Sequence, residues 1–465
     1  MPLRHLKSFL ASSAVAAALL LDPVTLNAQT LADALVTAYR TSPLLESSRA
    51  ALRGLDESVP IARSARRPQV GAGAGANANN TFDSTDPVYS LQADLTASLL
   101  LFDNGQTAAA VEAARNRIAS GRADLKDVEQ FVLFSAVQAY ADVRRDEEFV
   151  RIALNDVERM DETLRATRNR FEVGEVTRTD VSQSEARLAE SRSTLAGARG
   201  LLEVSREAYR AAVGTLPQNL APPPPIPELP RALDDAIGIG IRRSPVIIAA
   251  QFAERAAVYD FDRAMAAKGP SISATAGLGV RRSNSSMTRD WDNQGFGEAG
   301  IRGTLPLSTG GRNDALVRQA QAVLDQRRYD VQDAGRQVTQ QVAGAWTELE
   351  VARASIIARR EQVEASTIAA EGVTEEARLG ARSTLDVLDA QQEQLQAEAE
   401  VVRAQRDEYV AAYALLRSIG LLTVEHLGLG VESYDPDVNF SRVQAGRPGG
   451  YDTSVVDRIR SRWER

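Results

Sequence analysis

The sequence predicts a mainly α-helical chain with a smaller β-barrel part, arranged as two copies of one supersecondary unit. The first observation is an internal repeat, because Leu31–Pro43 recurs as Leu233–Pro245 at an offset of 202 residues. Further along, an offset of 206 residues relates four pairs of positions: Gly105 with Gly311, Gly174 with Gly380, Asp180 with Asp386, and Gly214 with Gly420. The second observation is that long proline-free stretches follow short segments of alternating apolar and polar residues. We therefore expect two pseudo-symmetric halves of one structure.

The N-terminal residues predict a secretory signal peptide at 1–28. Arg4 and Lys7 precede an apolar run over residues 9–21, and Ala28 is a small residue suited to cleavage. The alternative, an uncleaved anchor helix, is disfavoured because the run is shorter than the roughly 20 apolar residues that a spanning helix needs. We expect no transmembrane helix in the rest of the chain and, since there is no cysteine, no lipid-modified N-terminal cysteine.

The composition excludes several classes of function. A formal net charge of -8 argues against a nucleic-acid partner, since binding to phosphates depends on basic residues. The absence of cysteine excludes a disulfide framework. With 2 histidines in the whole chain, we find no Ser-His-Asp set, metal cluster or phosphate-binding loop. The sequence therefore predicts no catalytic residue, no metal site and no cofactor.

Each copy divides into two strands, a long helix and a returning helix, and the helical parts are rich in good helix formers such as Ala, Glu, Arg, Gln and Leu. In the first copy, 29–214, the expected elements are strands at 69–79 and 88–102 and helices at 106–171 and 178–212. In the second copy, 232–422, they are strands at 271–281 and 297–307 and helices at 312–376 and 384–418. A proline-rich linker, 215–231, joins the copies. Residues 423–465 form a further short segment and a tail that we expect to be extended or disordered from Ser441.

The expected strands have one apolar face and one polar face. In 88–102, Leu91, Ala93 and Leu95 alternate with polar residues, as a membrane β-barrel requires with lipid outside and water inside. A soluble sandwich with one buried face is the common alternative. Four strands in one chain cannot close a barrel, and open edges are not tolerated in lipid. Three chains with four strands each would close a 12-stranded barrel, which continues as a barrel of helices.

The long helices predict coiled-coil packing and hairpin ends. Apolar residues in the first long helix follow a heptad-like spacing: Val150, Leu154, Val157, Leu164 and Phe171. Gly174 and Gly380 can adopt the left-handed conformation that closes a helix, and Thr179 or Thr384 can cap the helix that follows. Further helices are expected at 43–66 and 245–267, where Ser42 and Ser244 precede proline.

These features resemble the TolC family of outer-membrane efflux and secretion channels, over residues 30–435. The residues that carry the resemblance are the strand-to-helix junctions Leu101–Gly105 and Ser308–Gly311 and the starts of the returning helices, Thr179–Val181 and Asp386–Ala390. The resemblance implies a homotrimer whose barrel contacts outer-membrane lipid and whose helices form a tunnel across the periplasm. It also implies that 215–231 and the start of 423–465 belong to an equatorial collar.

The resemblance further implies a gate at the hairpin ends. Asp386 and Asp389 lie three residues apart on one helix face and match the constriction carboxylates of the family, so three copies would form two rings selective for cations. Arg382 matches the constriction arginine, whose partners correspond to Thr179 and Asp180. The alternative is that the aspartates are solvated or cap a helix, and that Arg382 is an ordinary exposed arginine. Ala377 stands where the family has a tyrosine, so a second link is absent.

The same resemblance implies that the hairpin tips bind a periplasmic adaptor protein coupled to an inner-membrane transporter. The residues expected at this surface are Val173, Gly174, Glu175, Val176, Leu379 and Gly380. Simple packing of the turns would explain the same residues equally well.

The sequence therefore predicts a passive exit duct of a tripartite export system, with an ABC or proton-driven transporter supplying the energy. The sequence leaves three classes of cargo open, namely protein, drugs and metals. The lack of an N-terminal cysteine disfavours the lipid-anchored drug-efflux branch, and the tail after Tyr434–Pro436 resembles the type I secretion branch. An envelope-spanning structural coiled coil or adhesin stalk is the alternative, although it does not explain the paired strands. A secreted enzyme on a helical scaffold is a third class, which the shortage of histidine and cysteine disfavours.

Overall fold

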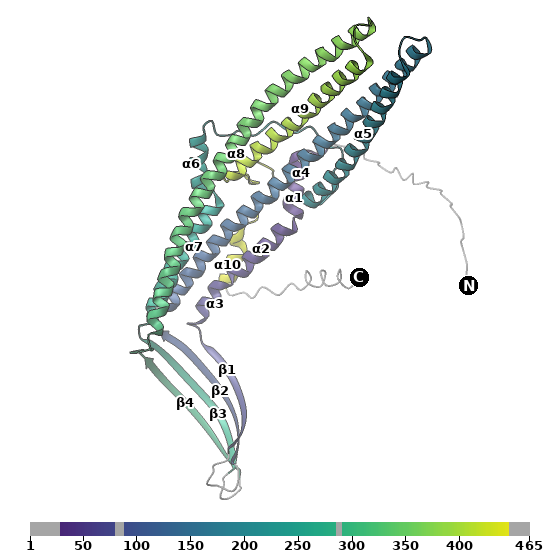
Figure 1. Cartoon of the computed structure of the whole chain (residues 1–465). Helices are drawn as coiled ribbons and strands as arrows, with labels where there is room; N and C mark the ends of the chain where they lie inside the picture. Colours follow the sequence, from purple (N-terminus) through teal and green to yellow (C-terminus); the bar gives the residue numbers. More distant parts are fainter. Residues whose placement is uncertain (1–27, 80–87, 285–290, 446–465) are drawn as a thin grey trace, which may run out of the picture.

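The structure, a computed structural model, describes residues 28–79, 88–284 and 291–445. It is an elongated molecule with a curved sheet at one end and long helices at the other (Figure 1). The predicted signal peptide lies outside these residues except for Ala28, and so does the tail beyond residue 445. None of the described helices has an apolar stretch long enough to cross a membrane.

Two antiparallel helical hairpins dominate the fold, as the repeat predicts. The first hairpin consists of α4 (Gln106–Glu172) and α5 (Arg178–Val213), and the second of α8 (Arg312–Arg378) and α9 (Thr384–Ser418). The helices α4 and α8 each contain 67 residues, which corresponds to about 100 Å of helix. Each returning helix covers only the half of its long partner that is farther from the sheet (Figure 1).

Shorter helices flank the other half of each long helix. They are α2 (Pro43–Asp56) and α3 (Ser58–Ser64) in the first repeat, and α7 (Pro245–Ala266) in the second. The predicted single helix 43–66 was wrong, because Pro60 has no amide hydrogen to donate to Asp56 and the helix is interrupted at Glu57. Ser42 caps α2, whereas Ser244 makes no side-chain cap bond to α7.

Three short helices were not predicted. These are α1 (Leu31–Thr41), α6 (Leu233–Arg243) and α10 (Pro436–Gln444). The helix α10 includes Ser441, so the expectation of an extended or disordered chain was wrong for residues 441–444, while residues 446–465 lie outside the described residues. Asp435 caps this helix by accepting a hydrogen bond from the Asp437 amide at 2.8 Å, and Pro436 occupies its first turn.

The sheet contains four antiparallel strands in sequence order. They are β1 (Gln69–Asn79), β2 (Val88–Phe102), β3 (Ser271–Asn284) and β4 (Trp291–Thr304). The strand β3 extends three residues beyond the prediction, and β4 lies earlier than the predicted 297–307. Trp291 pairs with Asn284, which lengthens the hairpin, and Pro306 cannot donate a ladder hydrogen bond, which ends β4 before it.

The register gathers apolar residues of all four strands on one face of the sheet. Leu95 of β2 lies opposite Ala72 of β1 and Leu278 of β3, and Leu278 lies opposite Gly297 of β4. Asp94 and its paired neighbours lie on the other face. Leu95 and Leu278 remain 43% and 62% exposed, so no part of the described chain covers the apolar face. One uncovered apolar face and one polar face are what a membrane barrel requires.

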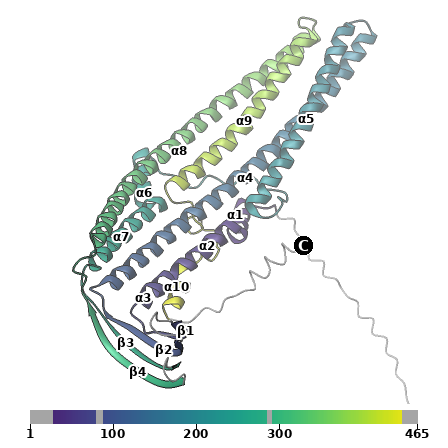
Figure 2. The same ribbon diagram turned by 60° about the horizontal axis from the view of Figure 1, so that its bottom comes forward.

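The helices form a curved wall one layer thick (Figure 2). In that wall α7 and α9 lie between α4 and α8, while α2, α3 and α5 lie on the other side of α4. The main core lies at mid-height, where α1 and α6 pack on the wall and Tyr140, Tyr209 and Leu416 are fully buried. This core joins the two repeats and fixes the relative position of the hairpins.

Candidate gate at the hairpin tips

Both hairpins close with the same turn. Gly174 and Gly380 have φ angles of +77° and +79°, in the left-handed region that glycine adopts without strain. The Glu175 amide donates to the Arg170 carbonyl at 2.9 Å, and the Ala381 amide donates to the Glu376 carbonyl at 2.9 Å. These bonds define a Schellman closure in each repeat, so the predicted role of the two glycines is confirmed.

The returning helices begin with identical capping boxes. The Thr177 amide donates to Asp180 Oδ2 at 2.8 Å, and the Ser383 amide donates to Asp386 Oδ2 at 2.9 Å. The hydroxyls of both residues complete the boxes by accepting from the backbone amides of the same aspartates. The expectation that Thr179 or Thr384 caps these helices was wrong, because the hydroxyl must lie three residues before the acidic residue.

Capping also determines the electrostatics of these two aspartates. Hydrogen bonds from Thr177, first of all from its hydroxyl, lower the pKa of Asp180. The backbone amide of Ser383 is the main cause that lowers the pKa of Asp386. Both carboxylates therefore stay ionised at neutral pH. The sequence allows Asp386 to be either a constriction carboxylate or a helix cap. Within a single chain it caps a helix, and its role in a ring of three chains stays a prediction.

Arg382 pairs within its own hairpin. Its Nε donates to Glu376 Oε2 at 2.8 Å, and this carboxylate raises the pKa of the guanidinium. Among the described residues Arg382 forms no hydrogen bond with Thr179 or Asp180, so the predicted link is not made within one chain. Glu376 lies in the last turn of α8 and is the acidic partner that the turn brings to Arg382.

A different ion pair joins the hairpins. Arg187 of α5 donates to Asp389 Oδ1 of α9 at 2.6 Å, and its other nitrogen reaches Glu190 at 3.0 Å. Beside this pair, Leu388 is 2% exposed and packs with Met160 and Leu188 of the first hairpin. Asp389 was predicted from the sequence as a gate residue, whereas Arg187 was not. The only signal for Arg187 was that it is an arginine on the hairpin that lacks the aspartate doublet.

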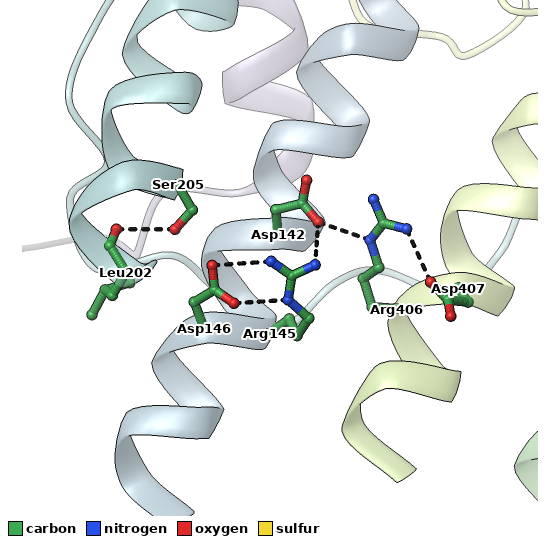
Figure 3. Close-up of polar contacts among 7 residues, drawn as sticks. All are labelled: Asp142, Arg145, Asp146, Leu202, Ser205, Arg406 and Asp407. Atoms are coloured by element: carbon green, nitrogen blue, oxygen red, sulfur yellow. Dashed lines mark hydrogen bonds and ion pairs between the residues drawn. The ribbon is translucent and has the colours of Figure 1, made fainter. Parts of the chain in front are cut away.

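A second polar connection lies at mid-height between α4 and α9 (Figure 3). Asp142 Oδ1 accepts from Arg406 Nε at 2.8 Å and from Arg145 at 2.8 Å. Arg145 also binds Asp146, whose side chain is 3% exposed, at 2.7 Å. Asp142 thus bridges an arginine of each repeat, which ties α9 to α4 beside the core residues Ala141 and Val143.

The predicted adaptor surface is exposed at the ends of both hairpins. Val173 and Leu379 are 72% and 86% exposed, and they precede the two tip glycines. Glu175 accepts from Arg170 Nε at 3.1 Å, while Val176 is half-buried behind the turn. The tips therefore present one apolar side chain each next to an exposed glycine turn. Val173 follows Leu164 of the nearest buried apolar cluster by nine residues, and Leu379 precedes Leu388 of that cluster by nine residues.

An uncovered sheet with a lipid-type face, joined to a curved wall of long helices, defines a protomer of an outer-membrane channel. A family model described as outer membrane efflux protein matches residues 34–215 and again 239–421. The chain belongs to this family, and the two matches confirm the internal repeat. It is a channel component and not an enzyme, with its sheet in the outer membrane and its helices in the periplasm.

Relatives and solved structures agree with this assignment. The chain is 35% identical over 435 residues to outer membrane efflux protein BepC of Brucella suis biovar 1, covering 92% of this chain and 95% of the relative. It is 25% identical to alkaline protease secretion protein AprF of Pseudomonas aeruginosa over 62% of this chain and 61% of that protein. The crystal structure of CusC has a TM-score of 0.74 at 18% identity and covers 85% of this chain and 92% of that one. The predicted resemblance to the TolC family is confirmed.

Proposed function

We propose that three copies of the chain form an exit duct through the outer membrane for a tripartite export system. The duct opens at its periplasmic helical end when an adaptor protein and an inner-membrane transporter engage the tips. The observation that carries this proposal is that the chain is an incomplete wall, open along both of its long sides.

Both sides of the wall are suited to contact a further copy. In the sheet, β1 and β4 each have one unpaired edge, which in a membrane must be paired. In the helical part, α8 exposes Val351, Ile357 and Ile368 by 62% to 64%, and the opposite side exposes Leu201 and Val204 of α5. Apolar side chains along both sides favour closure by identical copies. Three copies supply the twelve strands of a small barrel.

The ion pair that joins the two hairpins near the tips is a weak one. Arg187 and Asp389 have side-chain exposures of 29% and 58%. A pair this exposed contributes about 0–1 kcal/mol, so it biases a closed state without locking it. An adaptor that binds the tips can therefore shift the equilibrium with modest binding energy. In a trimer with threefold symmetry each contact occurs three times, so the shift from the closed to the open state is concerted.

The carboxylates near the tips support cation selectivity. We propose that Asp386 and Asp389 of three copies surround the narrowest part of the duct, with Arg382, Thr179 and Asp180 forming contacts between copies. The tip residues Val173, Gly174, Glu175, Val176, Leu379 and Gly380 then form the adaptor surface. The names of the relatives favour export: AprF is named as an alkaline protease secretion protein and BepC as an outer membrane efflux protein. We propose that the cargo of this duct is either a secreted protein or a small molecule.

Single-channel conductance of the purified protein in planar bilayers tests the proposal. We expect small cation-selective openings that a trivalent cation on the periplasmic side blocks. Asp386→Asn/Asp389→Asn should abolish that block, while Glu203→Gln on the exposed part of α5 should leave it unchanged. Folded, membrane-inserted oligomers without conductance would reject the duct and favour an envelope-spanning stalk. A block that survives the double substitution would reject these carboxylates as the constriction.

A further inference from the structure

A basic cavity lies at mid-height in the wall, away from both the tips and the sheet. It has a volume of about 650 Å³, within the usual range of roughly 300–1,000 Å³ for ligand pockets. Its basic side chains come from α4 and from the end of α6: Arg122, Lys126, Arg242 and Arg243. Glu425 is the one acidic residue that lines it. A cavity with four cations and one carboxylate stands out in a chain whose net charge is -8.

Three of these cations form no ion pair with a carboxylate in the described part of the chain, although burial raises the pKa of the nearby Glu129 carboxyl and the charge of Lys126 partly opposes that effect. Lys126, Arg242 and Arg243 form no ion pair there, whereas Arg122 pairs with Asp437 at 2.7 Å. Side chains of one charge sign that line a concave site concentrate the electrostatic potential there and attract ions of the opposite charge. The cavity is therefore complementary to a ligand that carries more than one negative charge.

Gln130 indicates what else the ligand contains. It lines the cavity and is 1% exposed, and neither its amide nitrogen nor its amide oxygen has a hydrogen-bond partner among the described residues. A buried amide without hydrogen-bond partners destabilises the folded state, because its lost hydrogen bonds to water are not replaced. The terminal torsion of glutamine is soft, so the amide can turn toward a group in the adjoining space. A peptide unit offers both the acceptor and the donor that this amide lacks.

The remaining wall of the cavity is apolar. Pro245, Ile248 and Phe252 of α7 line it together with Leu421. An extended peptide has side chains that can pack on such a wall, whereas a free inorganic anion gains nothing from it. Charge, an unsatisfied amide and an apolar wall thus point to the same class of ligand.

The position of the cavity excludes two other occupants. Arg122 and Gln130 lie 16 and 24 residues after the start of α4, which places them about 24–36 Å along the helix from the sheet. Lipid headgroups at the edge of the barrel do not reach that far. The lining comes from α4, α6, α7 and residues 420–426, which lie inside the wall of one protomer rather than along its open sides. A neighbouring copy that pairs along those sides does not cover it.

We propose that this cavity binds an acidic peptide segment of a periplasmic partner protein. The carboxylates of the segment pair with Lys126, Arg242 and Arg243, and one of its peptide groups binds the Gln130 amide. This contact lies at mid-height, so it is separate from the proposed adaptor surface at the tips. It would hold a partner along the side of the duct without affecting the gate.

Fluorescence anisotropy with the full-length protein in detergent micelles tests the proposal. The probe is fluorescein-labelled Glu-Ala-Glu-Ala-Glu, and the control peptide has glutamine at each glutamate. We expect Arg242→Gln/Arg243→Gln to weaken binding of the probe by at least about tenfold, and Lys126→Gln or Gln130→Leu by about threefold. Arg231→Gln, an exposed arginine outside the cavity, should leave binding unchanged. Conductance of all these variants should match the wild type.

Several results would overturn the inference. Equal binding of the glutamine peptide, or full binding by the double arginine variant and by Lys126→Gln, would show that the cavity is not the site. If inorganic phosphate displaced the probe at equal concentration, the cavity would be a binding site for small anions and not for a peptide. If a cell-wall stem peptide bound more tightly than the acidic probe, the ligand of the cavity would be the cell wall and not a periplasmic protein. Because the variants retain conductance, none of these outcomes depends on the duct.

Discussion

Arg187 of α5 and Asp389 of α9 form an ion pair at 2.6 Å that joins the two hairpins close to their tips. The pair lies next to Leu388, which is buried against the first hairpin. Because the pair joins α5 to α9, it is a contact that must break if the second hairpin moves away from the first. Its exposure to solvent makes it a weak and reversible contact.

Removing this ion pair should make the channel easier to open. We expect Arg187→Gln to increase the open probability in planar bilayers, because the closed state loses up to about 1 kcal/mol per protomer, while thermal stability barely changes. The matched control is Arg192→Gln, since Arg192 is 64% exposed and approaches Asp161 of its own hairpin at 3.9 Å. Equal open probabilities for the two variants would show that the Arg187 contact does not restrain the gate.

Local signals in the sequence predicted the hairpins well. Glycine at positions 174 and 380 specifies the turn by its own conformational freedom, so the repeat alone located both tips. Alternation identified the strands, but it did not locate the ends of β4, which depend on pairing of Trp291 with Asn284. The Arg187–Asp389 pair depends on how two hairpins pack, and no local pattern encodes that geometry. The cap at Ser383 could have been predicted, since Ser383 lies three residues before Asp386, which the sequence had already indicated.

The tip glycines should be sensitive to substitution in a way that helical glycines are not. Gly380→Ala places a side chain at φ +79° and should destabilise the second tip by about 1 kcal/mol. Gly372→Ala is the control, because Gly372 lies within α8, is exposed and has space for a methyl group. That change should stabilise the helix by up to about 1 kcal/mol. Hydrogen exchange at the end of α8 measures both effects, and faster exchange in Gly372→Ala would contradict this account.

Two buried tyrosines in the core should respond differently to loss of their hydroxyls. The Tyr140 hydroxyl donates to the Ala221 carbonyl at 2.6 Å and thereby anchors the proline-rich linker to α4. Burial raises the pKa of Tyr140 to about 12, so it remains a donor at neutral pH. The hydroxyl of Tyr209 is buried and has no partner among the described residues. We expect Tyr140→Phe to cost about 1 kcal/mol and Tyr209→Phe to be neutral or stabilising.

Urea unfolding followed by far-ultraviolet circular dichroism distinguishes the two tyrosine variants. The midpoint should fall for Tyr140→Phe and stay or rise for Tyr209→Phe, with equal slopes in both. The pair is well matched because the same group is removed from two fully buried rings in one core. A larger loss for Tyr209→Phe would mean that its hydroxyl has a partner in the assembled protein.

The last prediction concerns the pH dependence of α10. Asp56 is 1% exposed and accepts a hydrogen bond from Asn439 of α10 at 2.7 Å, while its other oxygen has no partner among the described residues. Burial raises the pKa of this carboxyl, although Asn439 and the charge of Arg122 partly oppose that effect and Asp437 adds to it. The folded state therefore binds the proton more tightly than the unfolded state. As pH rises from the ordinary value of 3.8 through the raised folded value, packing of α10 loses stability.

Asp56→Asn should remove this pH dependence, because the amide oxygen still accepts from Asn439 and no charge is buried. Hydrogen exchange of α10 amides, corrected for intrinsic rates, should be slower in the variant than in the wild type at pH 7, and the difference should shrink toward pH 4. Asp435→Asn is the control, since asparagine caps a helix as well as aspartate does and Asp435 lies in solvent. A variant that exchanges faster than the wild type at pH 7 would show that the ionised carboxylate, held by Arg122, stabilises this contact instead.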